Sequence, residues 1–163
     1  MKQAVDLGEL KLKNPVLTAS GTFGYGVEYG VFGDLRSLGG IVVKGLSLEE
    51  RPGNSGRRIA ETPCGMLNSI GLQNMGAGRF VREMLPQLPW DETPVVANIY
   101  AGDYDEFAEL AAYLADQDGI AGLEVNISCP NVRAGGASFG QDPEMAARAC
   151  AAVRERAGNK PMI

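Results

Sequence analysis

Residues 122–131 have the sequence GLEVNISCPN, which joins a buried strand to a group of polar side chains. The apolar run at 123–127 is rich in β-branched residues and follows two glycines, a pattern typical of a short buried strand. The run leads directly to Cys129 and a proline, which break the pattern. The carboxamides of Asn126 and Asn131 flank the thiol, and a glycine-rich segment follows. The stretch therefore predicts a site built at the end of a strand.

Three other apolar runs end in the same way, beside a polar or reactive residue. They are residues 15–19, 41–43 and 95–97, which stop at Ser20, Lys44 and Asn98 respectively. Helical patterns alternate with these runs, and they cover residues 29–35, 80–85, 103–114 and 142–153. Two of these helices begin with the N-cap pattern, at Asp103 and Asp142. Alternating strands and helices, with strands that lack a polar face, indicate a parallel sheet covered by helices.

Three further segments complete the expected organisation. Residues 5–12 alternate around Gly8 and Glu9, which predicts a two-stranded hairpin with one exposed face. Residues 48–76 have prolines and glycines throughout, which predicts a long irregular loop with a functional role. Residues 161–163 have the character of the start of a fifth strand.

A parallel sheet of four strands with two open edges would leave backbone groups unpaired. We therefore interpret the chain as an α/β protein, with an N-terminal hairpin and about the first four β/α units of an eight-stranded (β/α)8, or TIM, barrel. Residues 1–163 would then be the N-terminal half of a single barrel domain. In such barrels the active site lies at the carboxyl ends of the strands, where Ser20, Lys44, Asn98 and Asn126 are expected.

Composition argues against several classes of function. The 163 residues carry a formal net charge of −5, which argues against nucleic acid or an anionic membrane as a partner. The sequence contains no signal-peptide pattern and no apolar run that could span a bilayer, so we expect a cytoplasmic protein. Three cysteines without paired spacing predict neither a disulfide framework nor a zinc ribbon. Histidine is absent, which removes histidine nucleophile pairs, bases and metal sites.

Three motifs resemble those of a known family. They are NISCPN at 126–131, NSIGLQN at 68–74 and VKG at 43–45. With these motifs the chain resembles the soluble class of dihydroorotate dehydrogenases, flavin enzymes of pyrimidine synthesis, over residues 10–163. The Gly-Gly pair at 135–136 and the Phe-Gly pair at 139–140 are similar to the NAD-linked, type B branch. In that branch the catalytic subunit works with a partner subunit that holds FAD and an iron–sulfur cluster.

The resemblance implies an FMN-dependent enzyme that oxidises dihydroorotate to orotate in UMP biosynthesis. Cys129 would be the base that removes the C5 proton of dihydroorotate while a hydride passes from C6 to N5 of FMN. A thiol with an ordinary pKa of about 8.5 can act as a base near neutral pH if its surroundings stabilise the thiolate. The alternative, that Cys129 is a small buried apolar side chain, is disfavoured by the two flanking carboxamides.

The resemblance also implies which residues contact each ligand. Those expected to contact the substrate are Lys44, Asn68, Ser69, Ile70, Gly71, Leu72, Asn126 and Asn131, and those expected to contact FMN are Ser20, Lys44, Gly45, Asn98 and Asn126. Lys44 would stabilise negative charge on the flavin or on the substrate carboxylate. Carboxamides match the donor and acceptor edges of a pyrimidinedione ring. No metal site is expected.

Each of these assignments has a structural alternative. Lys44 could be a surface lysine whose stem packs on the sheet, and residues 68–71 could form a simple turn. The residues that could merely cap strands are Ser20, Gly45 and Asn98. An arginine cluster in the long loop is expected to be solvated or to lie at a subunit interface, and it comprises Arg51, Arg57 and Arg58. The other cysteines, Cys64 and Cys150, are expected to be structural.

The expected partners follow from the resemblance. They are dihydroorotate and orotate, a second catalytic subunit in a homodimer, and the electron-transfer subunit that passes electrons to NAD, with fumarate as the alternative acceptor. NAD is not expected to bind this chain, because Gly24-Tyr25-Gly26 lacks the spacing of a dinucleotide loop. The 163 residues alone are expected to bind FMN poorly and to lack measurable turnover.

Two other functions are consistent with the motifs. The pyrimidine-reducing domain of dihydropyrimidine dehydrogenase shares the Asn-x-Ser-Cys-Pro-Asn run and acts on uracil or thymine, which carry no carboxylate. A non-catalytic half-barrel would keep the motifs as a scaffold for interactions. Flavin absorbance and a comparison of the two substrates distinguish these functions.

Overall fold

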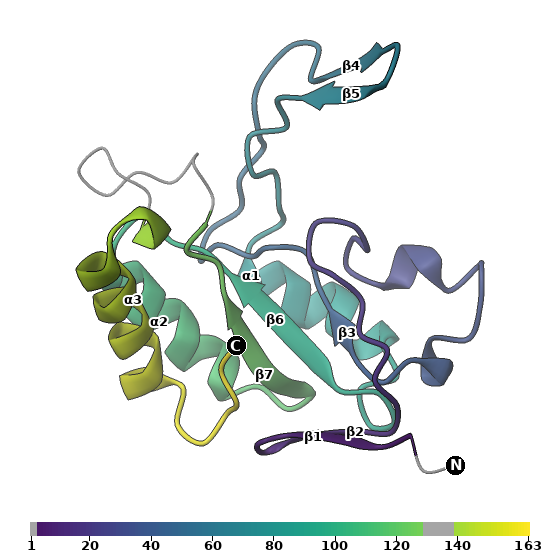
Figure 1. Cartoon of the computed structure of the whole chain (residues 1–163), viewed down its shortest axis with the longest axis vertical. Coiled ribbons are helices and arrows are strands. Elements are labelled where there is room, and N and C mark those ends of the chain that lie inside the picture. The colour runs from purple at the N-terminus through teal and green to yellow at the C-terminus, as the bar shows by residue number, and fades with distance from the viewer. Residues whose placement is uncertain (1–2, 129–138) are drawn as a thin grey trace.

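A parallel sheet lies at the centre of the molecule. The computed structural model describes residues 3–128 and 139–163, and its main sheet has the strand order β3-β6-β7 (Figure 1). The strands are β3 (Ile41–Val42), β6 (Val95–Ile99) and β7 (Ile120–Val125). All three are largely apolar and overlap the predicted runs, which confirms the parallel sheet.

Single bridges extend this sheet at both edges. Leu17 forms a parallel bridge with Gly40, so the strand expected at 15–19 is reduced to one pair of residues. At the other edge Leu123 bridges Met162, and the Ile163 amide donates to the Leu123 carbonyl at 2.9 Å, as expected for a fifth strand. Five adjacent parallel segments therefore follow one another in chain order, and within the described ranges the sheet does not close on itself.

Two long helices cover one face of the sheet. They are α2 (Tyr104–Ala115) and α3 (Pro143–Arg156), which pack against each other beside β7 (Figure 1). The predicted N-caps are confirmed, because the Asp103 and Asp142 carboxylates accept from the backbone amides three residues further on, at 2.8 and 2.9 Å. A short 3-10 turn, η5 (Phe139–Gln141), precedes α3.

A third helical segment changes its winding along its length. It comprises α1 (Ala77–Arg79), the π-helical η3 (Phe80–Met84) and the 3-10 turn η4 (Leu85–Gln87). The segment ends close to Pro86 and Pro89, as the sequence predicted. Within the part of the chain that the structure describes, no helix is both long and apolar enough to cross a membrane.

The helix expected at 29–35 is not formed. The structure has only two 3-10 turns there, η1 (Val27–Tyr29) and η2 (Leu35–Ser37). Between them Val31 and Phe32 are 83% and 84% exposed, so the apolar residues do not share a packed face. Glycines at 24, 26, 30 and 33 interrupt the segment, and they disfavour a helix because they have the most backbone freedom to lose.

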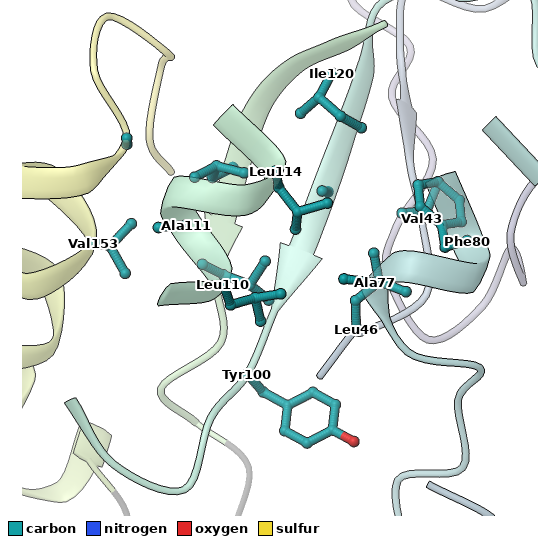
Figure 2. Close-up of a cluster of buried hydrophobic side chains, with 14 of the residues drawn as sticks. Val43, Leu46, Ala77, Phe80, Tyr100, Leu110, Ala111, Leu114, Ile120 and Val153 are labelled. Carbon is teal, nitrogen blue, oxygen red and sulfur yellow. The ribbon is translucent and has the colours of Figure 1, made fainter. Parts of the chain in front are cut away.

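The two faces of the sheet bury different partners. On the helix-covered face, Val95 and Ile99 belong to one core cluster with helix side chains such as Leu110. Figure 2 shows Val43 of this cluster beside Phe80. This is the larger of the two cores.

The other face packs on the N-terminal hairpin. Its strands are β1 (Val5–Leu7) and β2 (Leu10–Leu12), and the predicted turn has a left-handed Gly8 with φ of 62°. Leu10 and Leu12 contact Val42 and Val96, while Lys11 between them faces solvent, which confirms the predicted alternation in β2; Leu7 in β1 is exposed. The hairpin therefore covers the amino end of this second face of the sheet, which we call the inner face.

Residues 48–76, which we call the arm, project away from the body of the molecule (Figure 1). The prediction of an irregular loop was incomplete, because the arm contains a second hairpin, β4 (Ile59–Thr62) and β5 (Gly65–Asn68). All eight strand residues are exposed. A strand that buries neither face has no need of alternating hydrophobicity, so its pattern gives no signal in the sequence.

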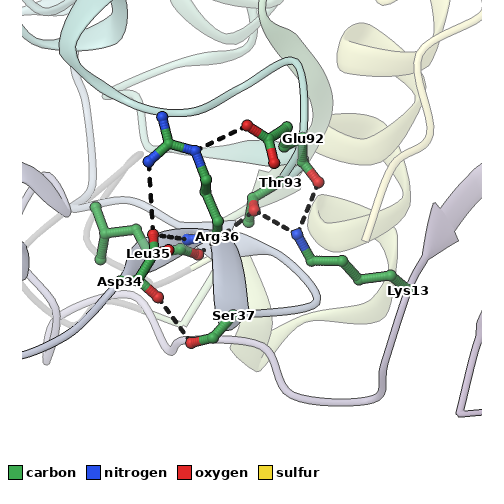
Figure 3. Close-up of polar contacts among 7 residues, drawn as sticks. All are labelled: Lys13, Asp34, Leu35, Arg36, Ser37, Glu92 and Thr93. Atoms are coloured by element: carbon green, nitrogen blue, oxygen red, sulfur yellow. Dashed lines mark hydrogen bonds and ion pairs between the residues drawn. The ribbon is translucent and has the colours of Figure 1, made fainter.

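Polar contacts join the segments that surround the amino ends of the strands (Figure 3). The Lys13 ammonium donates to the Glu92 carbonyl and to Thr93 Oγ1, both at 2.9 Å. Arg36 Nε donates to the Glu92 carboxylate at 2.8 Å, and Asp34 caps η2. These bonds connect the N-terminal hairpin, η2 and the turn that precedes β6.

Candidate active site

The pleat of the sheet decides which side chains reach the carboxyl end of the inner face. Val42 and Val96 are paired in register and face the N-terminal hairpin. Side chains two residues further along a strand return to the same face, so Lys44 and Asn98 lie beyond these valines. Glu124 is in register with Asn98 on β7. The inner face therefore changes from apolar to polar towards the carboxyl ends of the strands, as predicted.

These residues line a cavity of about 150 Å³, which we call the inner cavity. Its lining consists of Ser20, Gly21, Lys44, Gly45, Leu72, Asn98, Tyr100 and Asn126. All five residues that were expected to contact the cofactor are therefore brought together. Asn98 lies within β6 rather than after it, because the strand continues to Ile99.

A second cavity, of about 290 Å³, lies against the arm, and we call it the arm cavity. Its lining consists of Lys44, Asn54, Asn68, Ser69, Ile70, Gly71 and Leu72. The substrate residues expected at 68–72 thus meet Lys44, and Lys44 and Leu72 line both cavities. Two other expected residues, Cys129 and Asn131, lie outside the described residues.

A carboxylate orients the polar groups of the inner cavity. Glu124 Oε1 accepts from Ser20 Oγ at 2.6 Å and from Asn98 Nδ2 at 2.5 Å. The Asn98 amide nitrogen therefore faces Glu124, and its Oδ1 atom is buried with no hydrogen-bond partner in the described residues. An unsatisfied buried acceptor costs about 1–3 kcal/mol, so this oxygen is suited to a ligand that donates a hydrogen bond.

Glycine at position 45 keeps the space beside this oxygen open. A Cβ atom at Gly45 would lie 2.8 Å from Asn98 Oδ1 and 3.3 Å from the Tyr100 ring. Real Cβ atoms essentially never lie within 3.0 Å of such an atom, so an alanine here would force the Asn98 side chain to move. A flat ligand can therefore approach the backbone at this point, where a larger residue would fill the cavity.

The Lys44 side chain is half-buried and makes no hydrogen bond or ion pair among the residues that the structure describes. Its backbone amide is fixed by a 2.7 Å bond to the Gly24 carbonyl. A cation at a cavity wall without an acidic partner favours an anionic ligand.

Backbone strain marks the boundary between the two cavities. Leu72 has a φ of 58° and is the one non-glycine residue with positive φ in ranges 3–128 and 139–163. Such a conformation costs of the order of 1–3 kcal/mol and persists only where neighbouring groups hold it. The Leu72 carbonyl accepts hydrogen bonds from Tyr100 and Asn74.

The family profile described as dihydroorotate dehydrogenase matches residues 3–163. The chain belongs to the dihydroorotate dehydrogenase family. The resemblance carried by the three sequence motifs is thereby confirmed.

Three curated relatives of this chain are named dihydroorotate dehydrogenase B (NAD(+)), catalytic subunit. The relative from Solidesulfovibrio magneticus is 65% identical over 159 residues, which are 98% of this chain and 52% of the relative. Those from Maridesulfovibrio salexigens and Pelobacter propionicus are 60% and 54% identical, over 100% and 98% of this chain and 53% and 52% of their own lengths. The chain spans about half the length of the curated relatives it matches. Their names agree with the predicted similarity to the NAD-linked branch.

Sequence reasoning missed four residues that line or support these cavities. They are Ser47, Asn74, Tyr100 and Glu124. Glu124 lies in an apolar run, and its spacing of two residues from Asn126 could have placed both on one face. The other three follow strands or lie in the arm, and the sequence alone gives no sign that they meet.

A third cavity, of about 300 Å³, is also lined by Lys44. Tyr25 lines it, and its hydroxyl oxygen accepts from the Met75 amide at 2.9 Å. Burial raises the pKa of the Tyr25 phenol above its usual value, and nearby Glu28 adds to the effect against the opposing Met75 bond. The neutral phenol therefore anchors the end of the arm.

Proposed function

We propose that the chain forms the N-terminal half of a TIM-barrel domain in an FMN-dependent dihydroorotate dehydrogenase. The enzyme would oxidise dihydroorotate to orotate in UMP biosynthesis. Membership of the family supports this proposal, as do the five parallel segments in chain order. The observation that carries it is the meeting of the expected cofactor and substrate residues in two cavities that share Lys44.

The chemistry of the inner cavity fits a flavin ring. Asn98 Oδ1 is a buried acceptor without a partner in the described residues, and Gly45 leaves the approach to it open. FMN, when bound, supplies the hydride acceptor of the reaction. The residues that would hold its ring are Ser20, Lys44, Gly45, Asn98 and Asn126. Barrels commonly bind the cofactor phosphate with the loops after strands seven and eight, so this chain would contact the ring rather than the phosphate.

The arm cavity would hold the substrate. Lys44 supplies a positive charge for the carboxylate of dihydroorotate, and residues 68–72 supply the opposite wall. Asn68 and Asn126 would hydrogen-bond the ring edges, together with Asn131. The Asn126 carboxamide accepts from the Ser128 amide at 3.3 Å, which turns the chain directly after β7.

Cys129 would remove the C5 proton of the substrate. It follows Ser128, at the carboxyl end of β7, which is the end of the sheet where both cavities lie. The Lys44 ammonium would favour the thiolate form if the two groups come close in the complete enzyme. Water exclusion by the surrounding segments would protect the reduced cofactor from side reactions.

The expected partners also form part of the proposal. The name catalytic subunit, carried by the relatives, supports a separate electron-transfer subunit with FAD and an iron–sulfur cluster. We also propose a homodimer of catalytic subunits in the cytoplasm, with NAD as the final acceptor.

A pyrimidine-reducing activity like that of dihydropyrimidine dehydrogenase is the second candidate. Lys44 distinguishes the two, because uracil and thymine have no carboxylate for an ammonium group that makes no ion pair within residues 3–128 and 139–163. The full-length protein should be yellow after purification and should oxidise dihydroorotate but not dihydrouracil with an artificial electron acceptor. Activity with dihydrouracil alone would favour the second candidate, and a colourless inactive protein would favour a non-catalytic scaffold.

Cys129→Ala tests the proposed base. Turnover of dihydroorotate should fall by about 10²–10⁴, the usual contribution of a positioned base, with FMN still bound. Cys64→Ala is the matched control, because Cys64 is exposed at the turn of the β4–β5 hairpin. Unchanged turnover in the Cys129 variant would contradict the assignment.

A further inference from the structure

The arm joins the body through a narrow neck. Arg51 and Asn74 form an antiparallel bridge there, with N···O distances of 2.9 and 3.0 Å between their backbone groups. Beyond this bridge the arm carries residues 68–72 and the β4–β5 hairpin. The orientation of the neck therefore sets the position of the arm-cavity wall relative to Lys44.

A buried polar cluster lies at the neck. Ser47, Asn74 and Tyr100 are 1%, 4% and 1% exposed. Asn74 Nδ2 lies 2.7 Å from the Tyr100 hydroxyl, 2.9 Å from Ser47 Oγ and 3.1 Å from the Leu72 carbonyl oxygen. Asn74 Oδ1 accepts from the backbone amides of Ser47 and Gly76, at 3.2 and 2.8 Å. A satisfied network of this kind defines one local geometry and resists others.

The cluster holds the strained residue of the arm cavity. The Tyr100 hydroxyl donates to the Leu72 carbonyl at 2.9 Å, so this oxygen accepts from both Tyr100 and Asn74. Leu72 and Gly71 both have positive φ, of 58° and 76°. Without the two donors, no other hydrogen bond from the described residues would keep the Leu72 carbonyl in this orientation, and Leu72 could relax to the negative φ that a leucine prefers.

Tyr100 is well placed to link the two cavities. It follows Asn98 by two residues, and its ring lines the inner cavity. Figure 2 shows the ring at the edge of the aliphatic cluster, with the hydroxyl oxygen directed away from the core. The ring is thus held by the body of the protein while the hydroxyl holds the arm.

We propose that Tyr100 and Asn74 are positioning residues that fix the Gly71–Leu72 backbone and thereby hold the substrate wall opposite Lys44. The inference rests on the proposed function. It predicts that these two side chains act mainly on substrate affinity, because Gly71 and Leu72 both line the arm cavity, whereas Leu72 is one of eight residues that line the inner cavity.

Tyr100→Phe tests this role in the full-length, FMN-loaded protein. The substitution keeps the ring and removes only the hydroxyl. The Kd for orotate, measured from the flavin absorbance change on titration, should rise about tenfold, as expected for the loss of one buried hydrogen bond and the geometry it maintains. KM for dihydroorotate should rise in parallel, while the Kd for FMN should stay within twofold of the wild type.

Asn74→Asp provides a second variant. It keeps the Oδ1 acceptor for the Ser47 and Gly76 amides and removes the amide donor to Leu72. The orotate Kd should rise at least as much as in Tyr100→Phe, because the donor to both Leu72 and Tyr100 is lost.

Thr93→Val is the matched control. Thr93 has a fully buried hydroxyl just before β6, at the opposite end of the strand that Tyr100 follows. Its substitution should lower Tm but leave the orotate Kd unchanged. If Tyr100→Phe also lowers Tm while the orotate Kd stays within twofold of the wild type, the role of Tyr100 is structural and the inference is wrong. If the unsubstituted FMN-loaded protein fails to bind orotate, the proposed function is wrong, and the inference with it.

Discussion

The two ends of the parallel sheet use polar residues in opposite ways. At the amino end, Lys13, Arg36 and Thr93 all have partners, which connect the N-terminal hairpin, η2 and the turn before β6 (Figure 3). At the carboxyl end, the Lys44 ammonium and Asn98 Oδ1 have none in the described residues. At the amino end of these strands, the polar groups therefore have hydrogen-bond partners and stabilise the fold. At the carboxyl end, two polar groups lack partners among the described residues and are suited to a ligand. The comparison can be tested in the full-length protein of the proposed function, with substitutions made in pairs, one at each end.

The largest difference is expected between two lysines. Lys44→Met should lower kcat/KM for dihydroorotate by about 10²–10³, the usual effect of removing one group that stabilises developing charge. The free energy of unfolding should change little, because Lys44 makes no side-chain bond in the described residues. Lys13→Met should do the reverse, with a loss of about 0.5–1.5 kcal/mol in stability and unchanged kcat/KM. Steady-state kinetics and urea unfolding of both variants decide the matter, and equal stability losses would contradict the comparison.

Two glycines that flank β3 provide the next pair. Gly45→Ala should weaken FMN binding by about 1–3 kcal/mol, which is one to two orders of magnitude in Kd, because the new Cβ would meet Asn98 Oδ1. Gly40→Ala should instead lower stability, since its Cβ would lie 2.6 Å from the Leu17 side chain. Fluorescence titration with FMN and thermal unfolding measure the two effects. Normal FMN affinity in Gly45→Ala would show that the flavin lies elsewhere.

Two glutamates give a smaller contrast. In Glu124→Gln, the new amide can turn its nitrogen towards Asn98. Asn98 Nδ2 would then lose its hydrogen-bond acceptor, and the Asn98 side chain could rotate. The Kd for FMN should rise three- to tenfold, about 0.5–1.5 kcal/mol. Glu92→Gln removes the charge of an exposed pair with Arg36, so it should change stability by at most about 0.5 kcal/mol and leave FMN binding unchanged. Equal FMN affinity in all three proteins would remove Glu124 from the site.

The smallest effect concerns Tyr25 at the carboxyl end. Burial raises its folded-state pKa above the unfolded value of about 10, so the folded protein keeps the phenol proton while the unfolded chain loses it. The Tyr25 phenol therefore makes its full contribution to the free energy of unfolding below about pH 10. This contribution is lost as pH rises through the folded-state pKa of Tyr25. Absorbance at 295 nm during alkaline titration should show a late phase to which Tyr25 contributes. Tyr25→Phe should reduce the amplitude of that phase by one tyrosine, and an unchanged amplitude in this variant would contradict the assignment.

The elements that sequence reasoning found are those with local signals. The apolar runs of β3, β6 and β7 and the N-caps Asp103 and Asp142 each depend on residues within a few positions. The ends of the strands could be placed well enough to bring Ser20, Lys44, Asn98 and Asn126 together in advance, because parallel strands meet at one edge.

What was missed depends on distant contacts. Glu124 matters because it meets Ser20, 104 positions away in the chain, and Tyr100 matters because it meets Leu72 in the arm. No periodicity encodes such pairs. The absent helix at 29–35 shows the opposite error, since apolar residues at helical spacing were outweighed by the glycines around them.

The exposed hairpin of the arm has a consequence for proteolysis. A protease that cleaved the turn at Pro63 and Cys64 would leave two fragments still joined across the neck by Arg51 and Asn74, and by the contact of Arg58 with Gln73. The parallel strands lie on both sides of that cut and would stay paired. A nicked protein should therefore elute as a single species in native buffer and separate into two fragments only in denaturant.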